Sequence, residues 1–213
     1  MLLSYLSLPW TPKLLYGIIT DCFPICGSGK RSYVFIMGML QATACFCMAF
    51  FVFPTAGYVC GLACINSLGG AFMDVVVDGM MVINSRQDPT SGSEELQAYS
   101  WAFYGLGGMM GCLISGYFLT GEDANGTPTG NPYICFYIMV FFSAAVGISG
   151  LFIDKSLEDN QQDMVQMKFL QRSKFVLSEV GQGLKLKELY SSLMYQTILG
   201  AIIPSFGAYV YYY

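Results

Sequence analysis

The sequence predicts an all-α fold, a polytopic bundle of transmembrane helices. Of its 213 residues, 54% are hydrophobic and 11% are charged, whereas about a quarter of the residues in a soluble domain are charged. The apolar residues form long runs, and a helix of about 20 such residues spans the roughly 30 Å of hydrocarbon in a bilayer. The Lys and Arg residues gather in alternate connections between these runs, as expected when one side of the membrane is cytoplasmic.

The apolar runs divide into six predicted spans, separated by polar turns. They comprise residues 2–20, 33–53, 58–83, 96–119, 133–153 and 191–213. The third is long enough to cross the bilayer with some tilt. We interpret residues 1–153, which contain the first five spans, as one helical bundle.

Residues 154–190 hold half of the charged residues of the chain and no apolar run long enough to span. We interpret them as a cytoplasmic linker, after which residues 191–213 form the first span of a second, truncated bundle. Hydrophobic residues recur within the linker at roughly helical spacing, from Val165 to Leu184. This spacing is compatible with an amphipathic helix on the membrane surface and with a plain linker.

The basic residues set the orientation. Every Lys and Arg except Lys13 lies in the connections after the first, third and fifth spans, which a zigzag of helices brings to one side. The positive-inside rule makes that side cytoplasmic. The loop 121–131 then faces outward, and it contains Asn125-Gly126-Thr127, a predicted glycosylation site at Asn125. The same topology puts Met1 outside, so we expect a further helix to precede it.

The composition also excludes several kinds of partner. A net charge of −4 and the lack of a clustered basic face argue against nucleic-acid binding. The chain has no histidine, which excludes zinc sites and proton relays that use imidazole. We predict no metal and no cofactor. The predicted partners are the lipid bilayer and a small-molecule substrate.

Two acidic residues interrupt the third predicted span. Asp74 and Asp78 are four residues apart, which sets both carboxylates on one face of a helix. At about 1.5 Å per residue from Ile83, Asp74 lies some 14 Å and Asp78 about 8 Å from the cytoplasmic end of the span. An ionised carboxylate there needs a polar cavity, a partner or a proton. We therefore predict a functional site, with an ion pair that only joins helices as the alternative.

Lys13 is the predicted partner of these carboxylates. It lies in the middle of the first span, four residues after Pro9, and proline removes a backbone hydrogen bond and can kink a helix. A kink beside a cation favours a cavity at this point. In the alternative, Lys13 extends its ammonium group toward a lipid headgroup. This is difficult because Lys13 is seven residues from Thr20, the nearer end of the span.

Glycines in the third and fourth predicted spans indicate packing surfaces rather than a nucleotide site. A dinucleotide motif would need glycine at position 110, which is Met110. We interpret Gly107-x-x-x-Gly111 as a face that packs closely against a neighbouring helix. Gly69, Gly70 and Gly79 would give the third span similar small surfaces.

The turn between the first two spans combines glycine, acid and basic residues. The sequence Gly17-Ile-Ile-Thr-Asp21, followed by Lys30-Arg31, is similar to the signature that joins the second and third helices of major facilitator superfamily transporters. Asp21 and the basic pair would hold the cytoplasmic helix ends together through charge and dipole contacts, which break when that face opens. We assign this latch to Gly17, Asp21, Lys30, Arg31 and Arg86.

A more specific resemblance extends over roughly Pro9 to Gly116, where the chain looks like a member of the folate-biopterin transporter family. The matching motifs are Pro9-Trp10-x-x-Lys13, Tyr16-Gly17, Asp21-x-x-Pro24-Ile25, Lys30-Arg31-x-Tyr33, Asp74-Val75-x-x-Asp78 with Arg86, and Leu96-Gln97-x-x-x-Trp101. The resemblance implies a twelve-helix fold in two halves, of which this chain matches helices two to seven. A partial major-facilitator fold is therefore expected, without the first helix and most of the second half.

The resemblance further implies secondary active transport of folates, pterins or related anionic heterocycles by alternating access, with proton coupling as one option. Lys13 would bind a carboxylate of the substrate. Asp74, with or without Asp78, would bind the donor nitrogens of the pterin or carry the coupling proton. Trp10 or Trp101 would stack on the ring.

Three alternatives to transport are compatible with parts of the sequence. A membrane prenyltransferase would use Asp74 and Asp78 to hold magnesium and a pyrophosphate, but a second acidic pair at matching depth is missing. An intramembrane aspartyl protease typically has Gly-x-Gly-Asp, whereas Asp74 follows Ala-Phe-Met. A membrane fragment that does not transport by itself is the third possibility. Transport, without enzymatic activity, is the prediction.

Overall fold

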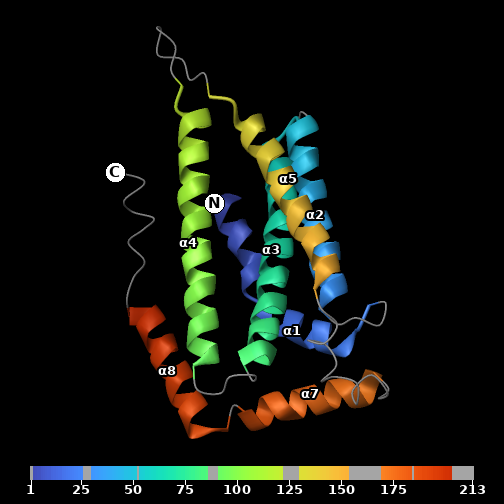
Figure 1. The fold of residues 1–213 in the computed structure, drawn as a ribbon, viewed down its shortest axis with the longest axis vertical. Helices are drawn as coiled ribbons and strands as arrows, with labels where there is room; N and C mark the ends of the chain where they lie inside the picture. Colours follow the sequence, from blue (N-terminus) through green and yellow to red (C-terminus); the bar gives the residue numbers. More distant parts are fainter. Residues whose placement is uncertain are drawn as a thin grey trace. The chain divides into compact units, whose positions relative to one another are not determined.

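A computed structural model describes residues 2–25, 30–51, 53–85, 91–121, 130–153, 169–183 and 185–202. Its regular elements in these ranges are helices, with no strand among them (Figure 1). The chain divides into two compact units, Met1–Gln166 and Met167–Tyr213.

The first unit contains four helices that are long and apolar enough to cross a bilayer. They are α2 (Arg31–Phe50), α3 (Ala56–Ser85), α4 (Gly92–Leu119) and α5 (Pro132–Ser149), the last of which continues into the short 3-10 helix η2 (Gly150–Phe152). At about 1.5 Å per residue, 20 residues extend over roughly 30 Å, the thickness of the hydrocarbon layer. The prediction of an all-α integral membrane protein is confirmed.

The first predicted span is two helical pieces instead of one. The 3-10 helix η1 (Leu2–Trp10) and the helix α1 (Lys13–Cys22) are separated by a turn at Thr11 and Pro12. Proline lacks an N–H and its ring disfavours the helical conformation of the residue before it, so the helix is interrupted at Thr11. The predicted break beside Lys13 exists, but Pro9, to which the sequence analysis assigned it, lies inside η1.

The four long helices alternate in direction. The start of α2, the end of α3, the start of α4 and the end of α5 lie at the lower end of the view in Figure 1. These are the helix ends that flank the basic connections in the sequence. The alternation matches the zigzag on which the predicted orientation rests.

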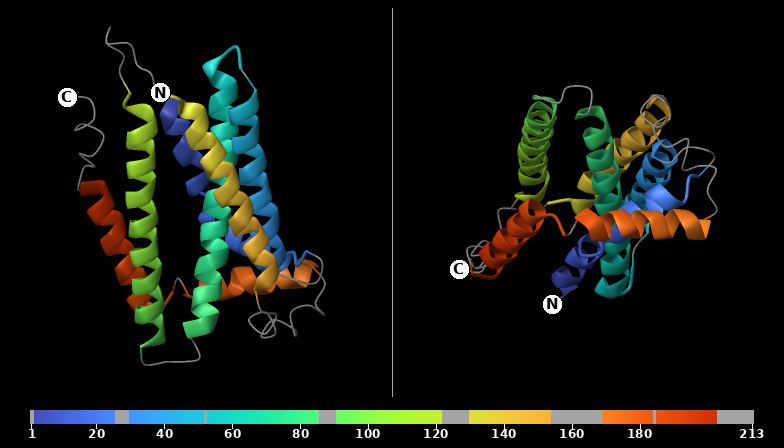
Figure 2. Two further views of the ribbon diagram at one scale, coloured as in Figure 1. Left: turned by 45° about the horizontal axis from the view of Figure 1, so that its top comes forward. Right: turned by 90° about the horizontal axis from the view of Figure 1, so that it is seen from below.

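The tightest helix contact joins α2 to α5, whose lower ends lie side by side in the left view of Figure 2. A Cβ atom added to Gly38 would lie 2.4 Å from the Cα of Gly147, and one added to Gly150 would lie 2.8 Å from a methyl group of Val34. Such distances leave no room for a side chain, so small residues allow the two backbones to approach.

The close-packing face predicted at Gly107 and Gly111 is not used within the described residues. A Cβ atom on either glycine would meet nothing within 4 Å, and α4 buries none of its residues. The two glycines instead border a cavity of about 470 Å³ between α4 and α5. The physical reason is that α4 stands apart from its neighbours in this unit. The glycine surfaces predicted on α3 do meet neighbours, since Gly69 contacts Gln41 of α2.

An aromatic cluster joins α1, α2 and α3. The ring of Phe72 stacks on Tyr16, with centroids 4.9 Å apart, and on Tyr33, with centroids 5.4 Å apart. All three residues are buried. The hydroxyl of Tyr16 donates to the carbonyl of Pro9, and that of Tyr33 donates to the carbonyl of Phe23. The cluster thereby joins α1 and α2 to α3, and its two hydroxyl groups bind the chain just before and just after α1.

The second unit contains α7 (Phe169–Gly183) and α8 (Lys187–Ile202). The helix α7 lies in the part of the predicted linker where hydrophobic residues recur at helical spacing. The helix α8 begins before the sixth predicted span and covers its first part, while residues 203–213 of that span lie outside the described residues. The boundaries predicted at residues 153 and 190 stay predictions.

Because α2 and α5 are so close, adding one methyl group at their contact should lower the stability of the bundle. Gly38→Ala should destabilise the bundle by about 1–3 kcal/mol, because overpacking forces the helices apart. The measurement is thermal unfolding of the full-length protein in detergent. Gly105→Ala is the matched control, since its Cβ would meet nothing within 4 Å. Equal melting temperatures for the two variants would contradict the close crossing.

Candidate functional site

The five residues predicted to bind substrate line one cavity of about 330 Å³ in the first unit. We call it the central cavity. Its lining consists of Trp10, Lys13, Asp74, Asp78, Met81, Gln97, Ser100, Trp101 and Tyr104. Small-molecule sites usually measure about 300–1,000 Å³, so the cavity is large enough for a small ligand.

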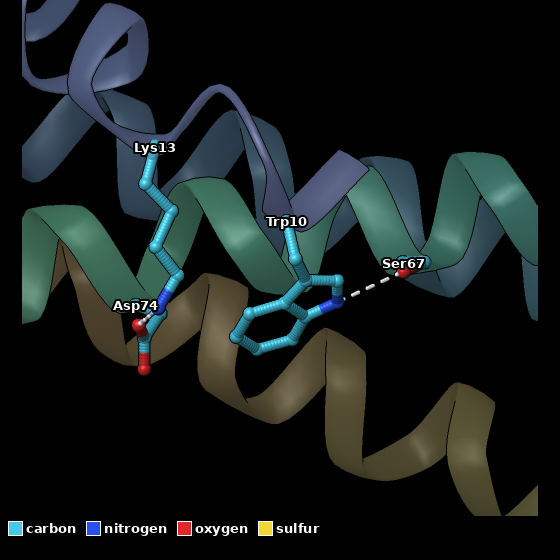
Figure 3. Close-up of polar contacts among 4 residues, drawn as sticks. All are labelled: Trp10, Lys13, Ser67 and Asp74. Carbon is cyan, nitrogen blue, oxygen red and sulfur yellow. Dashed lines mark hydrogen bonds and ion pairs between the residues drawn. The ribbon is translucent and has the colours of Figure 1, made fainter. Parts of the chain in front are cut away.

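An ion pair between Lys13 and Asp74 lies in this cavity (Figure 3). Lys13 is the first residue of α1, where the helix dipole disfavours a positive charge, and the carboxylate of Asp74 offsets that cost. The side chains are 39% and 42% exposed. Both side chains are therefore open to a molecule in the cavity, and a role of the pair beyond joining the two helices stays a prediction.

The indole of Trp10 is held between the ion pair and α3. The ammonium nitrogen of Lys13 lies 4.6 Å from the centroid of the Trp10 ring, a cation–π contact. The indole N–H donates to the hydroxyl oxygen of Ser67 over 3.0 Å, and Ser67 donates in turn to the carbonyl of Leu6 over 2.6 Å (Figure 3). The ring is therefore fixed at one end by a hydrogen bond and faces a cation at the other.

The helix α4 supplies the opposite wall. Gln97, Ser100, Trp101 and Tyr104 line the cavity, and their spacing of three, four and seven residues puts them on one helical face. The ring of Trp101 meets that of Tyr104 edge-on at 5.8 Å and is 66% exposed. Of these four residues of α4, only Trp101 is predicted from the sequence to bind substrate. The polar stripe in an apolar helix is the signal that would have revealed the others.

A second space continues the central cavity toward the end of α3. This end cavity measures about 230 Å³ and is lined by Asp78, Met81, Val82, Ser85, Ser93, Leu96 and Gln97. Asp78, Met81 and Gln97 line both cavities. The two aspartates therefore differ in position: Asp74 is paired with Lys13, while Asp78 lines both cavities, the second of which lies toward the end that we predict to be cytoplasmic.

The predicted latch residues surround the junction of α1 and α2. Gly17 packs on α3, where its Cβ would lie 3.6 Å from Val75. Lys30 is buried, and its ammonium nitrogen would lie 2.8 Å from a Cβ added to Gly79. Asp21 lies in the last turn of α1, and Arg31 begins α2. The structure thus brings Lys30 against α3, one residue from Asp78.

Two further hydrogen bonds join the same ends, and the sequence analysis missed them. The hydroxyl of Ser32 donates to the carbonyl of Ile25 over 2.9 Å, and that of Tyr33 donates to Phe23 over 2.8 Å. Arg86 and Asn125, the remaining predicted latch residue and the predicted glycosylation site, lie outside the described residues.

The fold and the cavity define the class of protein, an integral membrane protein with several membrane-spanning helices and a polar cavity among them. The chain belongs to the BT1 family, whose profile matches residues 1–213. The resemblance stated from the motifs is therefore confirmed.

Three curated relatives show what the chain is similar to. "Probable folate-biopterin transporter 4" of Arabidopsis thaliana is 33% identical over 114 residues, which is 53% of this chain and 23% of that protein. "Folate-biopterin transporter" of Synechocystis sp. is 29% identical over 112 residues, 52% of this chain and 22% of that protein. "Probable folate-biopterin transporter 7" of Arabidopsis thaliana is 21% identical over 214 residues, 97% of this chain and 45% of that protein. The chain thus spans less than half the length of these relatives. No solved structure matches it.

The geometry of the ion pair predicts energetic coupling between Lys13 and Asp74. In a double-mutant cycle of Lys13→Met and Asp74→Asn, we expect a coupling on the order of 1 kcal/mol, since both side chains are partly exposed. Thermal unfolding of the four proteins measures it. The same cycle with Asp78→Asn is the matched control and should give a clearly smaller value. Equal coupling to both aspartates would contradict the pairing.

Proposed function

We propose that the chain is part of a secondary active transporter of folates, pterins or related anionic heterocycles, which works by alternating access. The observation that carries the proposal is the central cavity, in which Lys13, Asp74, Asp78, Trp10 and Trp101 meet. A cation, two carboxylates and two large aromatic rings are what an anionic heterocycle with donor nitrogens requires. The printed names of the three relatives support this substrate class.

The ion pair is the part of the site that a substrate would change. A carboxylate of the substrate would share or take over the ammonium group of Lys13, which releases Asp74 to accept hydrogen bonds from the heterocycle. The side chains are open enough for this exchange. Trp10 on one side and Trp101 on the other supply flat surfaces against which the ring would stack.

Asp78 is the better candidate for the coupling proton. Among the described residues the recorded ion pair is that of Asp74 with Lys13, and Asp78 has no cation within salt-bridge distance. A carboxylate in a membrane cavity without a cation takes up a proton at lower cost than one that is paired. Asp78 also borders the end cavity, through which a proton would leave.

Alternating access would use the latch at the junction of α1 and α2. Lys30 lies against Gly79, next to Asp78, so movement of the latch and protonation of Asp78 would affect the same turn of α3. Opening the cytoplasmic face would separate the ends of α1 and α2 from α3.

The alternatives have less support. The prenyltransferase hypothesis has no counterpart in the names of the relatives, which are those of transporters; we infer that the protein is not an enzyme. The hypothesis of a fragment that does not transport alone is tested by comparing this chain with a full-length protein, because the relatives are more than twice as long.

Loss of either ion-pair partner should abolish transport. Lys13→Ala and Asp74→Asn, made in the full-length protein, are expected to reduce uptake of labelled folate into vesicles to background, with normal surface expression. Each removes a group that contacts the substrate. Uptake is measured with and without a proton gradient, so that substrate and coupling are tested together.

The matched controls for these two variants remove similar charges outside the cavity. Lys185→Ala and Glu95→Gln change exposed residues and should leave uptake within about twofold. Normal folate uptake by Lys13→Ala or Asp74→Asn would refute the assignment of the site.

Replacing the exposed indole on α4 should weaken binding in proportion to the lost stacking surface. Trp101→Ala is expected to raise the apparent KM for folate about fivefold, equivalent to roughly 1 kcal/mol of aromatic stacking, while Trp101→Phe keeps most of the affinity. Uptake kinetics in the same vesicles measure both variants. An unchanged KM in Trp101→Ala would exclude this ring from the site.

A further inference from the structure

Another cavity of about 430 Å³ lies on the far side of Trp10. We call it the Gln41 cavity. Its lining is Leu6, Trp10, Gln41, Met48, Val59, Ala63, Asn66, Ser67, Gly70, Phe136 and Met139. None of these side chains is charged, but three of them besides Trp10 carry polar groups. The cavity is therefore neutral and can form hydrogen bonds, unlike the central cavity.

The cavities follow one another along α3. The Gln41 cavity is lined by residues of α3 from Val59 to Gly70, the central cavity by Asp74 to Met81, and the end cavity by Asp78 to Ser85. The indole of Trp10 lines both the first and the second. Figure 3 shows this ring between Ser67 and the pair of Lys13 and Asp74. The two cavities thus share the indole of Trp10.

The side chain of Gln41 reaches its cavity because α3 has glycines where it crosses. A Cβ on Gly69 would lie 2.5 Å from the Cγ of Gln41, and one on Gly70 would lie 3.2 Å from its Nε2. The Nε2 group donates to the backbone carbonyl of Asn66 over 3.1 Å. This bond fixes the amide of Gln41 in the middle of two apolar helices, where polar side chains are costly and mark functional sites.

The two amides have hydrogen-bonding capacity left over. The Oδ1 atom of Asn66 accepts a weak bond from the Cys45 thiol over 3.4 Å. Within the part of the chain that the structure describes, the Nδ2 group of Asn66 and the Oε1 atom of Gln41 have no recorded partner. The cavity therefore offers one amide donor and one carbonyl acceptor beside an indole ring.

We propose that the Gln41 cavity is a second substrate site, which takes the uncharged, hydrogen-bonding edge of a planar heterocycle, and that Trp10, held by Ser67, separates it from the central cavity. The inference rests on the proposed function and deepens it. An edge with adjacent N–H and C=O groups matches the donor and the acceptor that the two amides present. The carboxylate of a substrate has no cation in this cavity and is recognised only at Lys13.

If the Gln41 cavity binds the heterocycle and Lys13 binds the carboxylate, variants of the two cavities should differ in their affinities for folate and biopterin. The affinities are measured on the full-length protein in nanodiscs. Gln41→Leu should weaken equilibrium binding of both biopterin and folate about tenfold or more, because both carry the heterocycle. Lys13→Ala should weaken the binding of folate at least tenfold and the binding of biopterin, which lacks a carboxylate, by a clearly smaller factor. Thr43→Val is the matched control on α2, since this exposed hydroxyl bonds only within its own helix, and should behave as the unmodified protein.

Gln41→Leu also removes a bond between α2 and α3, so a second variant fills the cavity without touching that bond. Ala63→Phe should weaken biopterin binding about tenfold, whereas Ile65→Phe, at an exposed position of the same helix, should not. Ser67→Ala should change the rate of biopterin uptake at least threefold, because it frees the indole of Trp10.

The outcomes separate the two proposals. Normal biopterin binding in both Gln41→Leu and Ala63→Phe would overturn the second site, and if Lys13→Ala still lost folate uptake, the proposed function would stand. An unchanged uptake rate in Ser67→Ala would overturn the separating role of Trp10. Normal folate uptake in every variant would overturn both proposals.

Discussion

The ion pair between Lys13 and Asp74 is the contact on which the polar interior of the first unit depends. A charge in the hydrocarbon region must be compensated, and this pair compensates two charges from different helical pieces at once. Its formation requires α1 to begin at Lys13, which Pro12 ensures, and requires α3 to present Asp74 toward that end. The stacked rings of Tyr16 and Phe72 hold the two helices in the same register. Polar chemistry and apolar packing thus specify one arrangement.

The site was more accessible to sequence reasoning than the helix packing. The spacing of Asp74 and Asp78, their depth in an apolar run and the lone Lys13 together indicated a cavity, because each would be too costly on a lipid-facing surface. The residues of α4 that complete its lining follow from the same helical periodicity. Helical periodicity does not indicate which of two nearby prolines interrupts a helix. The predicted interruption was at Pro9, whereas the structure has it at Pro12.

Close contacts between glycines depend on where two helices cross. The sequence of one helix alone does not determine that crossing point. Gly107 and Gly111 have the spacing of a packing motif, yet a Cβ on either would meet nothing within 4 Å in the described part of the chain. By contrast, Gly38 is the only glycine of α2, and it forms the tightest helix contact with Gly147. The same is true of Gln41, whose reach depends on Gly69 and Gly70 of another helix. Such residues become visible only when the helices are placed together.

The 3-10 form of η1 has a consequence for reach. A 3-10 helix rises about 2.0 Å per residue and an α-helix about 1.5 Å, so nine residues extend about 4–5 Å further in the 3-10 form. Such stretches are uncommon at this length, and η1 is fixed to α3 by Ser67. Counted from Leu6, whose carbonyl Ser67 binds, the four residues to Trp10 would be about 2 Å shorter in α-helical form. The elongated backbone therefore helps to set the position of the indole relative to both the hydroxyl of Ser67 and the ammonium group of Lys13.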